Sequence, residues 1–199
     1  MSLMDQLTQV VASQVSGQAA QQTGLSESLA EKMMPMAMAA LMAGLKKNAS
    51  NPLGAEALSQ ALERHDGSLL NNVGNLGDAN VLADGEKILG HILGGKQAQT
   101  TQALAKTAGV DQAQIAKLLA MAAPAVLASL GRAKREQGLD PAALAGLITK
   151  ESISAQKSAP QGLGVIMGFL DQNGDGDFKD DLIEAAGKQI LGSLFGKKH

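Results

Sequence analysis

Apolar residues recur every three or four places along most of the chain, which is the spacing of helices that bury one face. The two longest such stretches begin after Ser26 and Asp111, residue types that cap helix N-termini, and Asp111 with Gln114 has the spacing of a capping box. Pro35 and Pro124 fall inside these stretches, so each long helix is expected to kink or split there. The pattern predicts an all-α fold with roughly eight or more helices and no strand.

The chain contains an internal repeat. The segment GLSESLAEKMMPMAMAALMAGLKK, from Gly24, aligns without gaps with GVDQAQIAKLLAMAAPAVLASLGR, from Gly109. Each segment then reaches an N-cap residue followed by a proline, Asn51 in the first and Asp140 in the second. We therefore predict an internally duplicated helical bundle in which the two copies share one core and are related by an approximate two-fold or screw operation.

The predicted division places the first helical repeat at residues 1–76, the second at 77–155, and a C-terminal helix-loop-helix at 156–199. A further similarity joins the middle of the chain to its end, because DGEKILGHILGGK, from Asp84, resembles AGKQILGSLFGKK, from Ala186. Both segments predict a short helix that carries a glycine where another backbone passes closely and that ends at a glycine.

An acidic stretch, FLDQNGDGDFKDDLIEAA at residues 169–186, is the clearest candidate site, and it resembles an EF-hand loop counted from Asp171. Such a loop has oxygen side chains at its first, third and fifth positions, glycine at the sixth and a carbonyl ligand at the seventh. All of these requirements are met here. The predicted metal ligands are Asp171, Asn173, Asp175, Asp177 and Asp181.

The far end of the acidic stretch departs from the EF-hand pattern, because the ninth and twelfth positions are Lys179 and Leu182. We expect a shortened loop closed by Asp181, with Asp180 and Glu184 as alternatives. Calcium is favoured over magnesium because the ligands are many, flexible and all oxygen. The competing interpretation is an acidic turn that starts a helix and binds no ion.

A second copy of this turn occurs earlier in the chain. HDGSLLNNV, from His65, aligns with GDGDFKDDL, from Gly174, but Leu62 and Arg64 stand where the later loop has Asp171 and Asn173. The alignment predicts one turn geometry used twice, with the charge for a cation only in the later loop.

Composition narrows the classes of fold and function. The chain has no Trp, Tyr or Cys, and its three Phe all lie at or after residue 169, so the core must be built from Ala, Leu, Ile, Val and nine Met. A net charge of −2 and a pI near 5.9 give no general attraction to nucleic acid or anionic lipid. The N-terminus lacks the pattern of a signal peptide, and the longest apolar run, Met33 to Leu45, is too short to span a bilayer. We expect a cytoplasmic protein without a membrane span.

Catalytic motifs are absent from the sequence: it has no cysteine, phosphate-binding loop or nucleophile elbow. His65 and His91 by themselves make an incomplete metal site. We expect a non-enzymatic binding or structural protein whose partner is another protein or a second copy of the chain. The alternative is a DNA-associated helix-turn-helix-like protein without metal, for which the nearest recognition segment is residues 133–137.

The duplicated helical segments, the HDGSLL turn, the DGEKILGHILG helix and the terminal DQNGDGDFKDDL…LGSLFG together resemble the bacterial domain-of-unknown-function family 937. The resemblance covers nearly the whole chain and implies a soluble, Ala- and Gly-rich helical protein with no assigned activity. It implies the same five ligands in the later loop. It also implies a fuller acidic pattern in the earlier loop, where this chain has Arg64 and His65.

Overall fold

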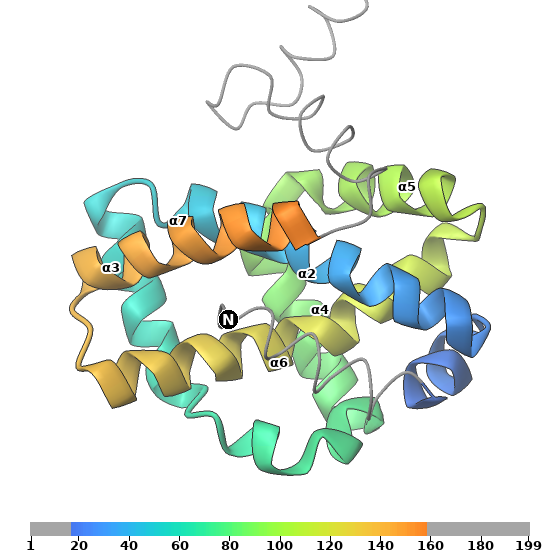
Figure 1. The fold of residues 1–199 in the computed structure, drawn as a ribbon, viewed down its shortest axis with the longest axis horizontal. Coiled ribbons are helices and arrows are strands. Elements are labelled where there is room, and N and C mark those ends of the chain that lie inside the picture. Colours follow the sequence, from blue (N-terminus) through green and yellow to red (C-terminus); the bar gives the residue numbers. More distant parts are fainter. Residues whose placement is uncertain (1–16, 159–199) are drawn as a thin grey trace, which may run out of the picture. The chain divides into compact units, whose positions relative to one another are not determined.

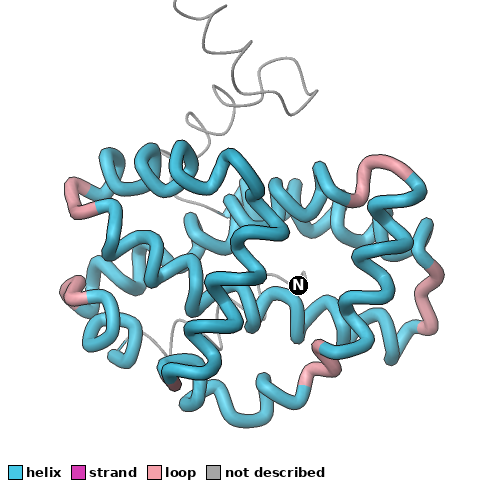
Figure 2. The backbone as a smooth tube through the Cα atoms, turned by 180° about the vertical axis from the view of Figure 1, so that it is seen from behind, coloured by secondary structure: helices cyan, strands magenta, loops and turns pink. Residues whose placement is uncertain are grey.

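Every regular element that the structure describes is helical (Figures 1 and 2). The computed structural model describes residues 17–158, and no strand occurs among them, so the all-α prediction is confirmed for this part of the chain. A helical stretch at 17–23 is followed by α2 (Glu27–Asn48), α3 (Pro52–Ala61), η1 (Leu62–Arg64), η2 (Ser68–Gly77), α4 (Ala79–Leu93), η3 (Gly94–Lys96), α5 (Gln97–Ala108), α6 (Gln112–Gln137) and α7 (Pro141–Ser158), where η marks 3-10 helices.

Helices α2, α3, α6 and α7 start where the sequence places them. The side chains of Ser26, Asn51 and Asp140 each accept a hydrogen bond from the backbone N–H three residues later, at 3.3, 2.9 and 2.7 Å. Asp111 and Gln114 form the predicted capping box at the start of α6. Each cap satisfies an N–H group that has no partner within the first turn of its helix, which fixes where the helix begins.

Helix α6, drawn in yellow in Figure 1, is the centre of the described body, and it contacts α2, α4, α5, η1 and η2. Helix α2 contacts α6 and also α3, α4, α5 and α7. Residues 17–158 pack as one compact unit around these two helices, and the predicted repeat boundary near residue 76 falls within η2.

The core between these helices is aliphatic and rich in methionine. Five methionines of α2 are at most 4% exposed, which confirms that the Met-rich cluster belongs to the core: Met33, Met34, Met36, Met38 and Met42. From α6 the buried side chains include Ile115, Leu118, Leu119, Met121 and Leu130. Unbranched, flexible Met side chains fill irregular gaps between helices, a role that aromatic residues have in many other cores.

By length and composition, α6 is the one helix among the described residues that is apolar enough to cross a membrane. However, 78% of its apolar window is buried against other parts of the protein. A central core helix has the same composition, and the packing of α6 accounts for its apolar surface.

Helices α2 and α6 each continue through the proline in their interior, so the expected split at Pro35 and Pro124 does not occur. Pro124 has no N–H to donate to the carbonyl of Ala120, four residues earlier. The backbone of α4 lies against this same carbonyl at Gly85, where an added Cβ would overlap the Ala120 oxygen. Helix α4 therefore approaches α6 closely at its proline-containing turn, and the predicted close approach in the DGEKILGHILG helix is confirmed.

Substitution of Gly85 tests this contact. Gly85→Ala is expected to lower the free energy of unfolding by about 2–3 kcal/mol, because a methyl group must displace backbone rather than a flexible side chain. Gly90→Ala is the matched control on the same helix, since nothing lies within 4 Å of an added Cβ there. The control should be neutral or stabilising by up to about 1 kcal/mol. Urea unfolding followed by circular dichroism measures both, and equal effects would contradict the close approach.

Candidate functional site

The five predicted calcium ligands, Asp171, Asn173, Asp175, Asp177 and Asp181, lie outside the described residues, as do the alternatives Asp180 and Glu184. The predicted site and the helix-loop-helix around it therefore stay predictions. Among residues 17–158 there is no group of three or more His, Asp or Glu side chains that could hold a metal ion. The earlier copy of the turn, residues 62–72, does lie within the described part.

The earlier turn is shaped by Asp66 and Gly67. The Oδ1 atom of Asp66 accepts a hydrogen bond from the backbone N–H of Ser68 at 2.9 Å, which forms an Asx turn. Gly67 has a φ of +87°, in the left-handed region that glycine adopts at little cost. Its carbonyl oxygen accepts from the N–H of Leu70 at 3.0 Å and starts η2. These local bonds explain why the sequence Asp-Gly begins the turn.

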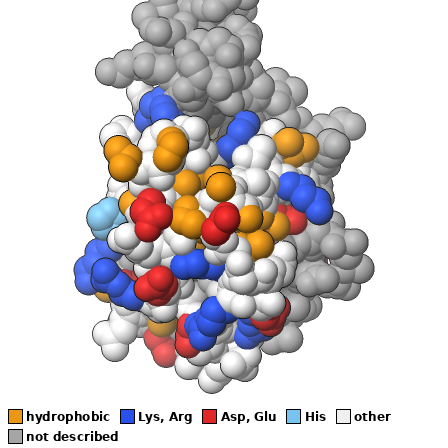
Figure 3. All heavy atoms as spheres, turned by 90° about the vertical axis from the view of Figure 1, so that its left-hand side faces the viewer, with side chains coloured by type: hydrophobic (Ala, Val, Ile, Leu, Met, Phe, Trp, Pro, Cys, Tyr) orange, Lys and Arg blue, Asp and Glu red, His pale blue; other side chains and the backbone are white. Residues whose placement is uncertain are grey.

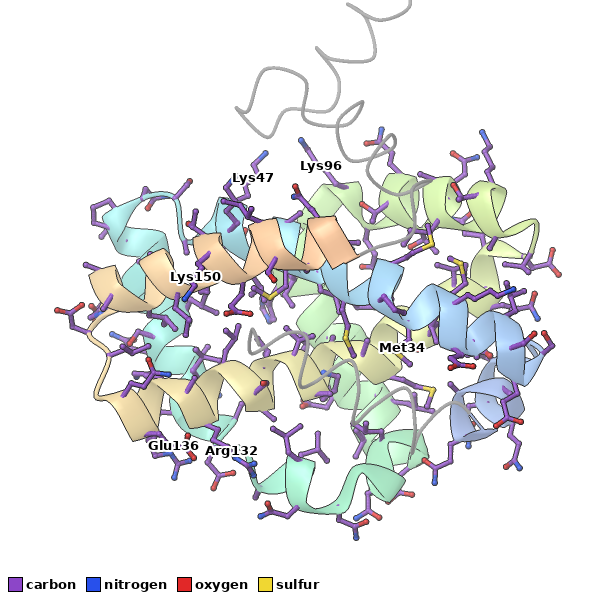
Figure 4. All side chains as sticks on the ribbon, in the orientation of Figure 1. Met34, Lys47, Lys96, Arg132, Glu136 and Lys150 are labelled. Carbon is purple, nitrogen blue, oxygen red and sulfur yellow. The ribbon has the colours of Figure 1, made fainter. Side chains whose placement is uncertain are left out.

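The turn is fastened to α6 by Arg132. One guanidinium nitrogen, Nη2, donates to the carbonyl oxygen of Gly67 and to Oδ1 of Asn71, and both distances are 2.8 Å. Figure 4 shows the Arg132 side chain reaching from α6 toward the start of η2. Two oxygens from two positions of the turn thus converge on one positively charged atom.

Two further basic residues of α6 contact the same region. The Nζ atom of Lys134 lies 2.7 Å from the carbonyl oxygen of Ser59 and 3.6 Å from a carboxylate oxygen of Glu63. Arg135 lies 3.4 Å from a carboxylate oxygen of Asp66, and both of these side chains are largely exposed. A shallow hollow of about 560 Å³ is lined by side chains of both signs from these two segments. Lys134 is therefore engaged within the protein as Arg132 is, whereas Arg135 makes an exposed ion pair.

Backbone packing holds the turn against α6 as well. The carbonyl of His65 lies against Gly131, where an added Cβ would overlap the oxygen. Gly131 is the residue before Arg132, so the close approach and the guanidinium contacts act at neighbouring positions of the helix. Together they fix the turn on the last part of α6.

The two histidines do not form a metal site. His65 is half-buried in the turn, and His91 is exposed on α4. Burial lowers the pKa of His65, the Asp84 carboxylate opposes this by raising it, and Arg64 adds to the lowering. The neutral imidazole is therefore favoured in the folded protein.

The sequence patterns did not single out Arg132 as a residue that binds the turn. One signal was available: the earlier turn has the spacing of a cation loop but keeps only Asp66 of the aligned aspartates. A turn of this kind needs a positive partner from elsewhere in the chain if its oxygens face inward. The partner lies 61 residues from Asn71 in sequence, so only the fold brings them together.

Comparison with known proteins gives the family. The model of the family described as "Bacterial protein of unknown function (DUF937)" matches residues 5–133 and 134–199. The chain belongs to this family. The predicted resemblance is confirmed over nearly the whole length of the chain, and the DUF937 description assigns no activity to the family. No curated protein and no solved structure matches the chain.

The lowered pKa of His65 predicts how stability depends on pH. Because its folded pKa is below the unfolded value of 6.5, the folded state binds fewer protons, and stability is fully present above that value. Stability should fall as the pH drops below about 6.5 toward the folded pKa. In His65→Gln this contribution should disappear.

The measurement is the midpoint of urea unfolding at two pH values. An unperturbed histidine is mostly neutral at about pH 7.5 and mostly charged at about pH 5.5. His91→Gln is the matched control for removal of one exposed histidine. If His65→Gln lost as much stability on acidification as the wild type, titration of His65 would not be the cause.

Proposed function

We propose that this DUF937 protein is a non-enzymatic helical protein, structural or binding in role, whose acidic loop at residues 171–181 binds one calcium ion. The ion would be held by Asp171, Asn173, Asp175, Asp177 and Asp181, with Asp180 and Glu184 as alternatives for closing the loop. Its role would be to stabilise the fold rather than to switch it.

The observation that carries this proposal is the contact of Arg132 with the earlier turn. There, a carbonyl and an amide oxygen each lie 2.8 Å from one cationic nitrogen. The acidic loop has the same Asp-Gly sequence, and it carries aspartates at the positions aligned with Asn71 and Asn72. A turn that directs neutral oxygens toward a cation supports cation binding by its acidic counterpart, because five aspartates repel one another unless an ion neutralises them.

The described helices also support the proposed duplication. Gly24 and Gly109 both have a φ near +70°, at 74° and 67°, and each is followed by a capped helix that contains a proline. The next helices, α3 and α7, both begin at a proline after an Asx cap. Superposition of residues 24–61 on 109–158 in an experimental structure tests the duplication, and differing helix crossings would reject it.

Thermal melting in chelator and in millimolar calcium tests the calcium proposal. A ligand that binds only the folded state adds about 2.7 kcal/mol at a hundred times its Kd, which would raise the Tm by roughly 5–10 °C for a chain of this length. Asp171→Ala combined with Asp175→Ala should abolish the shift.

The matched control is Glu31→Ala with Glu86→Ala, which removes two exposed carboxylates from the described helices and should keep the calcium response. Calorimetry on the wild type measures binding directly. An unchanged wild-type Tm with no heat of binding would leave the acidic stretch as a turn that starts a helix.

The alternative function is DNA association without metal, and the contacts of α6 disfavour it. Lys134 and Arg135 in residues 133–137 contact groups of the protein itself, and acidic and basic side chains alternate on the face shown in Figure 3. DNA binding depends on basic side chains that are free to neutralise phosphates. We expect no retention on heparin or duplex DNA at physiological salt. Salt-dependent retention that Lys134→Ala with Arg135→Ala removes would favour this alternative.

A further inference from the structure

The oxygens around Arg132 are arranged as ligands around a cation. The carbonyl of Gly67 and the amide oxygen of Asn71 both accept from the same nitrogen, although four residues separate them in sequence. The carboxylate of Asp66 lies beside them. Its Oδ1 accepts a hydrogen bond from the N–H of Ser68, and its Oδ2 forms an ion pair with Arg135. The turn thus presents oxygens toward α6, and only cationic side chains of α6 meet them.

The Arg132 side chain lies directly on the buried Gly67. A Cβ added at Gly67 would be 2.8 Å from Cβ of Arg132 and 2.9 Å from its Nε, so the aliphatic stem and the head group both lie on this residue. Arg132 is half-buried, its bond to Gly67 is partly buried, and its bond to Asn71 is exposed. Both bonds are charge-assisted, which makes them stronger than bonds between neutral groups. The stem of Arg132 therefore packs on Gly67 while its head group meets two oxygens of the turn.

We propose that residues 65–72 form a cation-binding loop whose cation is supplied by the chain itself, the guanidinium of Arg132. The loop is closed without any dissolved ion, and removal of the side chain leaves a site for a free guanidinium ion. Calcium is not the ligand of this site, because two neutral oxygens and one carboxylate fall short of the six to eight oxygens that calcium takes. The proposal is independent of calcium binding by the acidic loop.

Guanidinium rescue of Arg132→Ala is the central experiment, with the full chain and thermal melting as the readout. The variant should lose roughly 5–10 °C in Tm, because two charge-assisted hydrogen bonds are removed. Millimolar guanidinium, far below the molar range in which the ion unfolds proteins, should restore most of the loss. Urea and sodium chloride at the same concentrations should restore none of it.

Arg135→Ala is the matched control, because it removes the same side chain three residues further along the helix. Arg135 makes only an exposed ion pair with Asp66, so its loss should cost little, and guanidinium should not raise the Tm of this variant. Calcium in place of guanidinium should leave the Tm difference between the wild type and Arg132→Ala unchanged. Any effect of calcium through the acidic loop would act on both proteins alike.

A double-mutant cycle between Arg132→Met and Asn71→Ala applies even if Arg132→Ala does not fold, because Met keeps an apolar stem over Gly67. The proposal is supported if the double variant loses less Tm than the sum of the losses of the two single variants. Additive losses overturn it. It is equally overturned if Arg132→Ala melts like the wild type, or if guanidinium helps Arg132→Ala no more than urea does.

Discussion

The packing of the described helices is constrained by the close approach of the α4 backbone at Gly85 to the carbonyl of Ala120 in α6. Pro124 removes the N–H that would otherwise bond to this carbonyl, and glycine is the residue that lets a second backbone come near it. A larger residue at position 85 would push α4 away from α6. Because α4 also contacts α2, that displacement would open the core that all three helices share.

The aliphatic core makes such backbone contacts important. Residues 17–158 contain no aromatic side chain, so helices cannot be held apart and oriented by large rings. Alanine and glycine bring helices close together, and the methionines of α2 fill the remaining space. Tight helix packing therefore replaces the bulk that aromatic residues supply in other proteins.

Electrostatic contacts at the end of α6 also hold the segment around residues 59–71 against this helix. Arg132, Lys134 and Arg135 extend from the last turns of the helix to the end of α3 and the segment that follows it. Basic residues interact favourably with the negative end of the helix dipole at a helix C-terminus. Here the same positive charges also bind the oxygens of the neighbouring segment. The same contacts explain why a basic helix end in an acidic chain does not by itself indicate nucleic-acid binding.

The sequence by itself determined the helical fold and the starts of α2, α3, α6 and α7, because these depend on local spacing and on caps such as Ser26, Asn51 and Asp140. It also determined family membership and the acidic loop as the candidate site. Only the tertiary structure decided that α6 is the central helix, that it runs through Pro124, and that Arg132 binds the turn. These features depend on contacts between residues that are distant in sequence, 65 positions apart in the case of Gly67 and Arg132, and no local pattern specifies which distant side chain or backbone will meet a given helix face.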